Sequence, residues 1–189
     1  MDPIYTEDWF SGNIGIWTQV LGAFKDKPVR GLEIGSFQGR SSRWLMENIL
    51  THPESRLACV DTFEGSVEHN EHHLRNLRAL FDHNLSPYRE KLDLLVGKSQ
   101  QVLRTYTTPV DFAYVDGDHH AFAVLEDAIH AFRVLKPGGF LIFDDYQWYG
   151  CPRDIDNPYL AIDTFLSFFR DKITVVHKGY QVIVQKQTD

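Results

Sequence analysis

Cysteine is scarce in this chain of 189 residues, and positive charge is in deficit. The sequence has two cysteines, and 19 lysines and arginines stand against 26 aspartates and glutamates, so the formal net charge is −7. Cys59 and Cys151 cannot build a disulfide framework and show no zinc-ligand spacing, which favours a reducing compartment. The acidic balance argues against nucleic-acid and anionic-membrane partners, because both bind basic surfaces.

Long apolar runs and linker-like stretches are also missing. No run approaches the ~20 residues that cross a bilayer, and the first residues lack the basic and apolar regions of a secretory signal. There is no internal repeat and no stretch rich in proline and glycine. We therefore expect a cytoplasmic protein with a single domain over residues 1–189, made of a helical cap (1–27) and a core (28–189).

What the sequence does contain is an alternation of short apolar runs with longer amphipathic stretches. This alternation predicts parallel strands joined by helical crossovers, and two β-rich runs around Gly179 predict a hairpin at the C-terminus. The expected fold is α/β, doubly wound and Rossmann-like, with a mostly parallel seven-stranded sheet that ends in an antiparallel hairpin. The five parallel strands are expected at 29–34, 57–61, 92–96, 112–116 and 140–144. Helices are expected at 12–25, 41–50, 74–81, 99–105, 122–135 and 160–169.

Acidic residues and glycines gather where the predicted strands end. The first strand ends at Glu33 and Gly35, the second at Asp61, the third at Gly97, the fourth at Asp116 and the fifth at Asp144. Ligands bind at the carboxyl edge of open parallel sheets. The functional site is therefore predicted at that edge.

The first strand runs into a glycine-rich turn, LEIGSFQGRSSRWL, at residues 32–45. Gly35 and Gly39 allow close backbone approach, and Ser41 opens a helix whose N–H groups can receive an anion. The glycine spacing is not the dinucleotide fingerprint, and the carboxylate of Glu33 would repel a pyrophosphate. A ligand with a sulfonium or ammonium group and a carboxylate suits this turn better, and S-adenosylmethionine has these groups. Asp61 stands where an acid can accept both ribose hydroxyls.

With EIGSFQG at 33–39, Asp61, and LKPGG at 135–139, the chain resembles the class I S-adenosylmethionine-dependent methyltransferases from about residue 28 to its end. The resemblance implies that the glycine turn faces the methionine part of the cofactor and that the strand-two acid holds the ribose. GKSQ at 97–100 is similar to the adenine-contacting turn of the catechol-type subgroup. The cofactor-binding residues expected on this basis are Glu33, Gly35, Ser36, Gly39, Ser41, Asp61, Ser99, Gln100 and Asp116.

A second constellation comprises VDGDHH at 115–120 and FDDY at 143–146. Neighbouring parallel strands lie ~4.8 Å apart, so Asp116, Asp144 and Asp145 should converge. Three carboxylates held together need a cation, or their pKa values must rise. Oxygen ligands suit Mg²⁺, with Mn²⁺ and Ca²⁺ as alternatives.

The same pattern is similar to metal-dependent O-methyltransferases of the catechol-type and sugar-modifying branches. That resemblance implies that Asp116, Asp144 and Asp145 bind the metal, and the Asp-Asp pair looks more like the sugar-modifying branch. A base must also take the acceptor's proton. We expect His119 in this role, because its unperturbed pKa is near neutrality, and Asp118 stays open as the alternative.

These inferences predict an S-adenosylmethionine-dependent, metal-assisted O-methyltransferase that acts on a vicinal diol of a sugar or glycan. The alternatives are a catechol-like or other phenolic acceptor, a nicotinamide-dependent oxidoreductase, and a non-catalytic cofactor-binding module. The short cap leaves open a homo-oligomer or a domain of a longer enzyme. The histidines at 69, 72 and 73 are expected on a solvated surface. Aromatic candidates for an acceptor wall are Tyr5, Trp9, Phe10, Tyr146, Trp148 and Tyr149.

Overall fold

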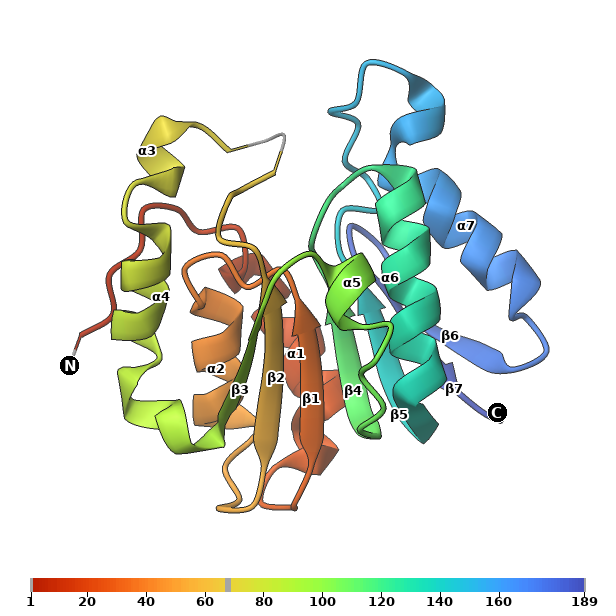
Figure 1. The fold of residues 1–189 in the computed structure, drawn as a ribbon. Helices are drawn as coiled ribbons and strands as arrows, with labels where there is room; N and C mark the ends of the chain where they lie inside the picture. The colour runs from red at the N-terminus through yellow and green to blue at the C-terminus, as the bar shows by residue number, and fades with distance from the viewer. Residues whose placement is uncertain (1, 67–68, 189) are drawn as a thin grey trace.

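The computed structural model describes residues 2–66 and 69–188, and Figure 1 shows its ribbon. The strands are β1 (Arg30–Ile34), β2 (Arg56–Asp61), β3 (Leu92–Val96), β4 (Val110–Val115), β5 (Leu135–Phe143), β6 (Ile173–Lys178) and β7 (Val182–Lys186). The α-helices are α1 (Ile14–Leu21), α2 (Arg40–Asn48), α3 (Glu71–Leu74), α4 (Leu77–Asn84), α5 (Ser99–Val102), α6 (Ala121–Val134) and α7 (Pro158–Phe168). None of the helices in these ranges combines the length and apolarity needed to cross a membrane.

One seven-stranded sheet organises the chain, in the order β3-β2-β1-β4-β5-β7-β6. The first five strands in this order run parallel to their neighbours, and β7 pairs antiparallel with both β5 and β6. The predicted fold class is confirmed, including the terminal hairpin. The strand order reverses between β1 and β4, and open α/β sheets bind ligands in the crevice at such a switch point.

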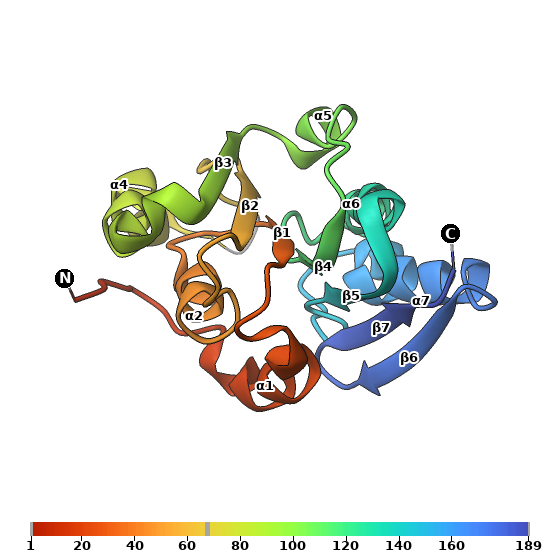
Figure 2. The same cartoon turned by 90° about the horizontal axis from the view of Figure 1, so that it is seen from below.

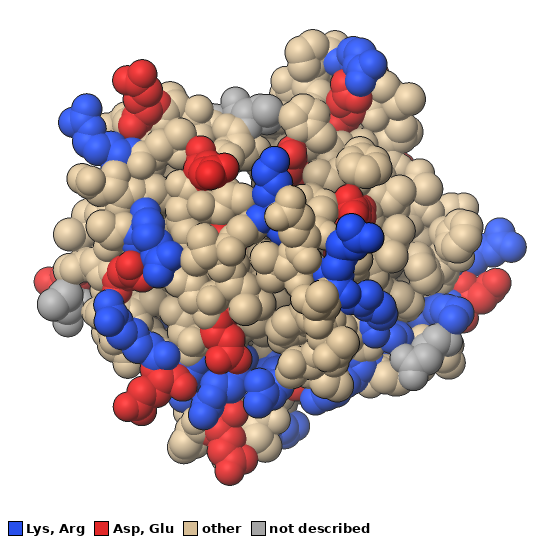
Figure 3. All heavy atoms as spheres, in the orientation of Figure 1, with Lys and Arg blue, Asp and Glu red and all other residues tan. Residues whose placement is uncertain are grey.

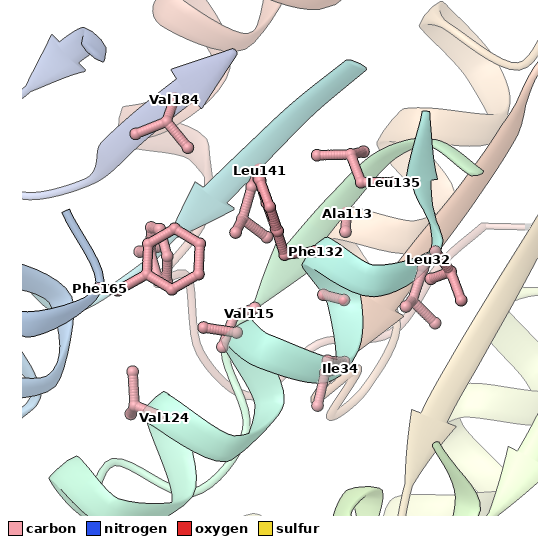
Figure 4. Packing of buried hydrophobic residues seen from close by; sticks show 14 of the residues in the cluster. Leu32, Ile34, Ala113, Val115, Val124, Phe132, Leu135, Leu141, Phe165 and Val184 are labelled. Atoms are coloured by element: carbon pink, nitrogen blue, oxygen red, sulfur yellow. The ribbon is translucent and has the colours of Figure 1, made fainter. Parts of the chain in front are cut away.

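Helices cover both faces of the sheet, as Figure 2 shows from below. On one face, α6 and α7 pack Phe132 and Phe165 against inward-facing residues of β1, β4 and β5, and Figure 4 shows part of this cluster. On the other face, α1, α2 and α4 bring Trp17, Leu45 and Phe81 onto the sheet. Because both faces are covered at the centre of the sheet, β2 and β4 are largely apolar runs without alternation, whereas the edge strands β3 and β6 are only partly buried.

Some element boundaries differ from the expectation. The helix predicted at 74–81 corresponds to α4, which begins at Leu77, and the short helix α3 precedes it; the two are separated because Arg75 is extended and Asn76 is left-handed with φ 58°. Asparagine tolerates that conformation better than most residues. The helix predicted at 12–25 is α1 between two short 3₁₀ turns. The predicted 99–105 helix ends at Val102, and β5 begins at Leu135 rather than at residue 140.

Residues 2–10, which we call the strap, run across the glycine turn before α1. Thr6 donates its N–H to Gln38 Oε1 at 2.8 Å, and Gln38 donates back to the Thr6 hydroxyl at 2.8 Å. Ile4 donates its N–H to Asn84 Oδ1 at 2.7 Å, and Asn84 Nδ2 donates to the Ile4 carbonyl at 2.8 Å. These side-chain amides satisfy the strap's backbone groups, so the strap is held against the start of α2 and the end of α4.

Candidate functional site

A cavity of about 950 Å³ opens at the carboxyl edge of the sheet. Its lining comes from the strap, from the glycine turn, from the segments after β2, β3 and β4, and from the loop after β5. Figure 1 shows the α3 segment and the loop after β5 standing above this edge on opposite sides. Typical small-molecule sites span about 300–1,000 Å³, so this cavity is large enough for a cofactor and a second small molecule together.

Gly35 brings the ends of β1 and β4 into contact. Its φ is 83°, and a Cβ there would lie 1.8 Å from the backbone oxygen of Asp116. Only glycine relieves both the left-handed strain and the overlap. The close approach leaves the turn's backbone exposed to the cavity, where a ligand can pass over it.

Glu33 lies beneath the turn rather than in the cavity. It is 0% exposed, and its carboxylate accepts hydrogen bonds from the hydroxyls of Ser36, Ser41 and Ser42. Burial raises the pKa of this carboxyl, and the serine hydroxyls lower it. We expected Glu33 to contact the cofactor; the structure gives it the role of holding the turn and the first residues of α2 together, because three hydroxyls enclose its charge.

Gly39 also stays outside the cavity lining, and it begins α2 with a left-handed φ of 76°. Gly35, Ser36 and Ser41, by contrast, line the cavity. Of the five residues predicted in this turn, three therefore line the cavity, and Glu33 and Gly39 lie outside its lining.

Asp61 lines the cavity and also ties down the turn. Its Oδ2 accepts the N–H groups of Ser36 at 2.7 Å and Phe37 at 2.9 Å, and its Oδ1 accepts that of Phe63 at 2.7 Å. A carboxylate has about four acceptor sites. In this arrangement Asp61 keeps one further acceptor position, on Oδ1.

The turn after β3 forms the neighbouring part of the cavity. Ser99 and Gln100 line it at the start of α5. Phe122, on the first turn of α6, lines the same cavity and is 78% exposed. The sequence does not single out Phe122, since a phenylalanine at the start of a helix is otherwise indistinguishable from a core residue.

The acidic residues meet above β4 and β5. His119 Nε2 lies 3.1 Å from Asp145 Oδ2 and 3.7 Å from Asp116 Oδ1. One ligand atom from each of these three residues lies within 4.8 Å of the other two. Asp145 is held in a left-handed conformation with φ 58°, and such strain in a non-glycine residue typically marks functional sites.

Asp144 lines the same cavity and shares the Tyr114 hydroxyl with Asp116. Its Oδ2 accepts the Tyr114 hydroxyl and, at 2.9 Å, the Gln181 amide, while its Oδ1 accepts the N–H of Asp145 at 2.8 Å. We predicted Asp116, Asp144 and Asp145 as the converging set. The imidazole of His119 takes the third place in the observed group, and Asp144 retains acceptor capacity on Oδ1.

A layer of hydrogen-bond donors supports the carboxylates from behind. The Tyr114 hydroxyl also approaches Asp116 Oδ2 at 2.8 Å, Trp17 Nε1 donates to Gln181 Oε1 at 2.8 Å, and the Tyr180 hydroxyl donates to Asp145 Oδ1 at 2.8 Å. Tyr114 was recognisable in principle, because it stands two residues before Asp116 on the same strand. Tyr180 and Gln181 come from the hairpin turn, whose position depends on the topology.

Several carboxylates lie close together in this part of the cavity, and they shift the pKa values of their neighbours. Burial, followed by the charge of Asp144, raises the pKa of the Asp116 carboxyl well above its ordinary value. Burial and the nearby carboxylates raise the pKa of the Tyr114 hydroxyl as well. A cation at this position would lower the pKa values of both groups.

The two candidate bases differ in their surroundings. His119 is buried, with its ring edge-on to Trp148 at 5.0 Å, and it lies between two carboxylates. Asp118 lines the cavity but pairs with His120, whose Nδ1 lies 2.6 Å from Asp118 Oδ1.

The aromatic candidates divide into two sets. Trp9, Phe10 and Trp148 line the cavity. Tyr5, Tyr146 and Tyr149 are engaged elsewhere: Arg40 lies over Tyr5, Tyr146 bonds Asp163, and Tyr149 packs on Tyr159. The expected solvated surface for the histidines is wrong for His69, which lines the cavity, and for His73, which is buried.

A sheet in the order β3-β2-β1-β4-β5-β7-β6, with a cavity over a glycine turn after β1 and an acid after β2, defines the class I methyltransferases. The family model described as a methyltransferase domain matches residues 32–146. The chain belongs to this family. The resemblance inferred from its motifs is confirmed.

Among proteins similar to this chain, an uncharacterized protein of Acanthamoeba polyphaga mimivirus is 25% identical over 135 residues, which is 71% of this chain. The chain spans 59% of that relative's length. The solved O-methyltransferase TomG from Streptomyces achromogenes, involved in tomaymycin synthesis and in complex with S-adenosylmethionine, is 18% identical with a TM-score of 0.68, over 95% of this chain and 82% of TomG. MycE of the mycinamycin pathway, in complex with Mg, S-adenosylhomocysteine and mycinamycin VI, is 14% identical with a TM-score of 0.65, over 96% of this chain and 50% of MycE.

Proposed function

We propose that this protein is a divalent-metal-assisted O-methyltransferase that uses S-adenosylmethionine and acts on a vicinal diol of a sugar or glycan. The observation that carries the proposal is the group formed by Asp116, His119 and Asp145, inside a cavity that also contains the glycine turn. In this family of folds the methyl donor lies over that turn. An acceptor oxygen held at the acidic group would then face the donor's sulfonium.

The residues of the acidic group fit a divalent cation. A carboxylate oxygen of Asp116, one of Asp145 and a ring nitrogen of His119 lie within 4.8 Å of one another. Mg²⁺ prefers the carboxylate oxygens, which leaves the imidazole to act as the base. Asp116, Asp145 and the remaining acceptor capacity of Asp144 would hold the ion. A divalent cation bound here would lower the pKa of a hydroxyl coordinated to it. Mn²⁺ and Ca²⁺ are accommodated by the same oxygen donors.

The chain's own residues prepare the transfer. Gly35 exposes the turn's backbone to the methionine part of the donor, Asp61 accepts one ribose hydroxyl, and Ser99 and Gln100 face the adenine. His119 takes the acceptor's proton, since its buried imidazole lies between Asp116 and Asp145 and can exist as an ion pair with them once protonated. The methyl then passes in line from sulfur to oxygen, which leaves S-adenosylhomocysteine.

Two similar structures support parts of this proposal. TomG holds S-adenosylmethionine, and MycE holds Mg and S-adenosylhomocysteine. The MycE complex also contains mycinamycin VI, which is consistent with a small-molecule acceptor. An excess of acidic residues around the cavity argues against nucleic acid as the acceptor. We also propose one domain over 1–189 and a cytoplasmic location, which suits two free cysteines.

Methyl transfer to a panel of sugar diols and catechols, followed by mass spectrometry, tests the proposal. We expect one added methyl group in the presence of Mg²⁺, and loss of transfer in chelator or in Asp145→Asn. Asp171→Asn serves as the matched control, because Asp171 is exposed and outside the cavity. Full activity in chelator would overturn the metal assignment, and full activity of His119→Ala with loss in Asp118→Asn would move the base to Asp118.

A further inference from the structure

One side of the cavity is a wall of rings that the methyl-transfer chemistry does not use. We call Trp9, Phe37, His69 and His73 the ring wall; the first three line the cavity, and His73 is buried against Trp9. Phe37 and His69 stack with centroids 4.8 Å apart at 20°, and Trp9 lies 5.2 Å from Phe37 and 5.6 Å from His69. His73 meets Trp9 edge-on at 5.3 Å. Three separate segments of the chain supply these rings.

The ring wall is fixed before any ligand arrives. Phe37 has a left-handed φ of 45°, a strained conformation that the bond from its N–H to Asp61 holds in place. His69 Nδ1 accepts the N–H of Ser66 at 2.8 Å. Asp8 accepts the N–H of Ser11 at 2.9 Å and pairs with Arg40 at 3.2 Å, which anchors the chain beside Trp9. A preformed surface loses less entropy when it binds a ligand.

Trp9 nevertheless remains 53% exposed, although it lines the cavity. A large aromatic face turned toward a cavity gains most when a flat apolar surface covers it. The C–H face of a sugar ring and the face of a phenol both present such a surface. A ring-shaped acceptor would therefore lie against Trp9.

The charges around the cavity favour some acceptors over others. Among the described lining residues, eight are carboxylates and two are lysine or arginine. Figure 3 shows acidic side chains on either side of the small opening near the top of the molecule, with a basic side chain beside it. S-adenosylmethionine carries one net positive charge and a divalent cation two, so the acids remain in excess with both bound. An acceptor with a carboxylate or phosphate would meet like charge, which costs binding energy.

We infer that the acceptor is a ring-shaped diol that is uncharged or cationic, bound with one face on Trp9, and that anionic acceptors are excluded. This inference rests on the proposed function, because it assigns the acceptor's part of the same cavity. Glu7, which lines the cavity at the edge of the ring wall and lies 3.4 Å from His73 Nε2, adds a carboxylate near any amino group of the acceptor.

Binding of matched ring diols in the presence of S-adenosylhomocysteine and Mg²⁺ tests the inference. The probes are methyl glucoside, methyl glucosaminide and methyl glucuronide, and beside them 4-methylcatechol, dopamine and protocatechuate. In at least one series, we expect the neutral and cationic members to bind about tenfold more tightly than the anionic member, because of the like-charge cost. Trp9→Ala should lower the affinity for those diols that bind the wild-type protein about tenfold and leave the affinity for S-adenosylhomocysteine unchanged. Phe168→Ala is the control, because Phe168 is a distant, exposed aromatic residue on α7; this substitution should change neither affinity.

The inference is overturned if an anionic member binds as well as its neutral partner, if Trp9→Ala has no effect, or if none of the six probes binds. Failure of the proposed function is recognised separately: the wild-type protein would then not bind S-adenosylhomocysteine, or it would transfer methyl groups with full activity in chelator.

Discussion

Replacing Gly35 with alanine tests whether the glycine turn is the structural basis of the site. The new Cβ would stand 1.8 Å from the backbone oxygen of Asp116, with φ at 83°. A left-handed non-glycine residue costs about 1–2 kcal/mol, and overpacking costs about 1–3 kcal/mol. We therefore expect Gly35→Ala to lower the free energy of unfolding by about 2–5 kcal/mol. The ends of β1 and β4 must also move apart, so affinity for S-adenosylhomocysteine should fall at least about tenfold.

Urea unfolding followed by circular dichroism gives the stability change, and calorimetric titration gives the affinity. Gly15→Ala is the matched control: nothing lies within 4 Å of its Cβ position, and alanine in α1 should stabilise by about 0.5–1 kcal/mol. If Gly35→Ala unfolds at the wild-type urea concentration and binds S-adenosylhomocysteine normally, the assignment of Gly35 to the contact between β1 and β4 is refuted.

Three further substitutions probe the surroundings of the site. Tyr114→Phe removes the hydroxyl that bonds Asp116 and Asp144, and we expect Mn²⁺ affinity, measured by titration calorimetry, to fall about tenfold or more. Phe122→Ala should weaken S-adenosylhomocysteine binding about fivefold through lost stacking with an unchanged melting temperature, because Phe122 is 78% exposed; a lowered melting temperature would contradict this. Burial raises the pKa of Asp127 to about 7, so the folded chain binds a proton that the unfolded chain releases near pH 4, and stability is lost as the pH rises toward 7. Asp127→Asn should therefore be more stable than wild type by about 2–4 kcal/mol at pH 8 in urea unfolding, with the gap closing toward pH 4; a pH-independent gap would contradict the assignment.

Much of the fold was predictable because its signals are local. Apolar runs bounded by glycine and acidic residues mark β1 to β5, and the hairpin follows from two β-rich runs around Gly179. The break between α3 and α4 was not predictable, since it depends on the left-handed conformation of Asn76. Helical periodicity continues across that break and gives no warning of it.

The candidate site was predictable in its residue types and less so in its geometry. Strand ends place Asp61, Asp116 and Asp145 at one edge, as the sequence indicates. The burial of Glu33 and the position of Asp144 depend on which partners surround each carboxylate: three serines for Glu33, and Tyr114 with Gln181 for Asp144. Such partners come from distant segments, and no local pattern reveals them.

The most direct test of the central claim is a calorimetric titration of the wild-type protein with S-adenosylhomocysteine and, separately, with NAD⁺. If the cavity over the glycine turn is a methyl-donor site, S-adenosylhomocysteine binds with one site per chain and NAD⁺ gives no binding heat. Binding of NAD⁺ without binding of S-adenosylhomocysteine would contradict the account and favour a nicotinamide-dependent oxidoreductase.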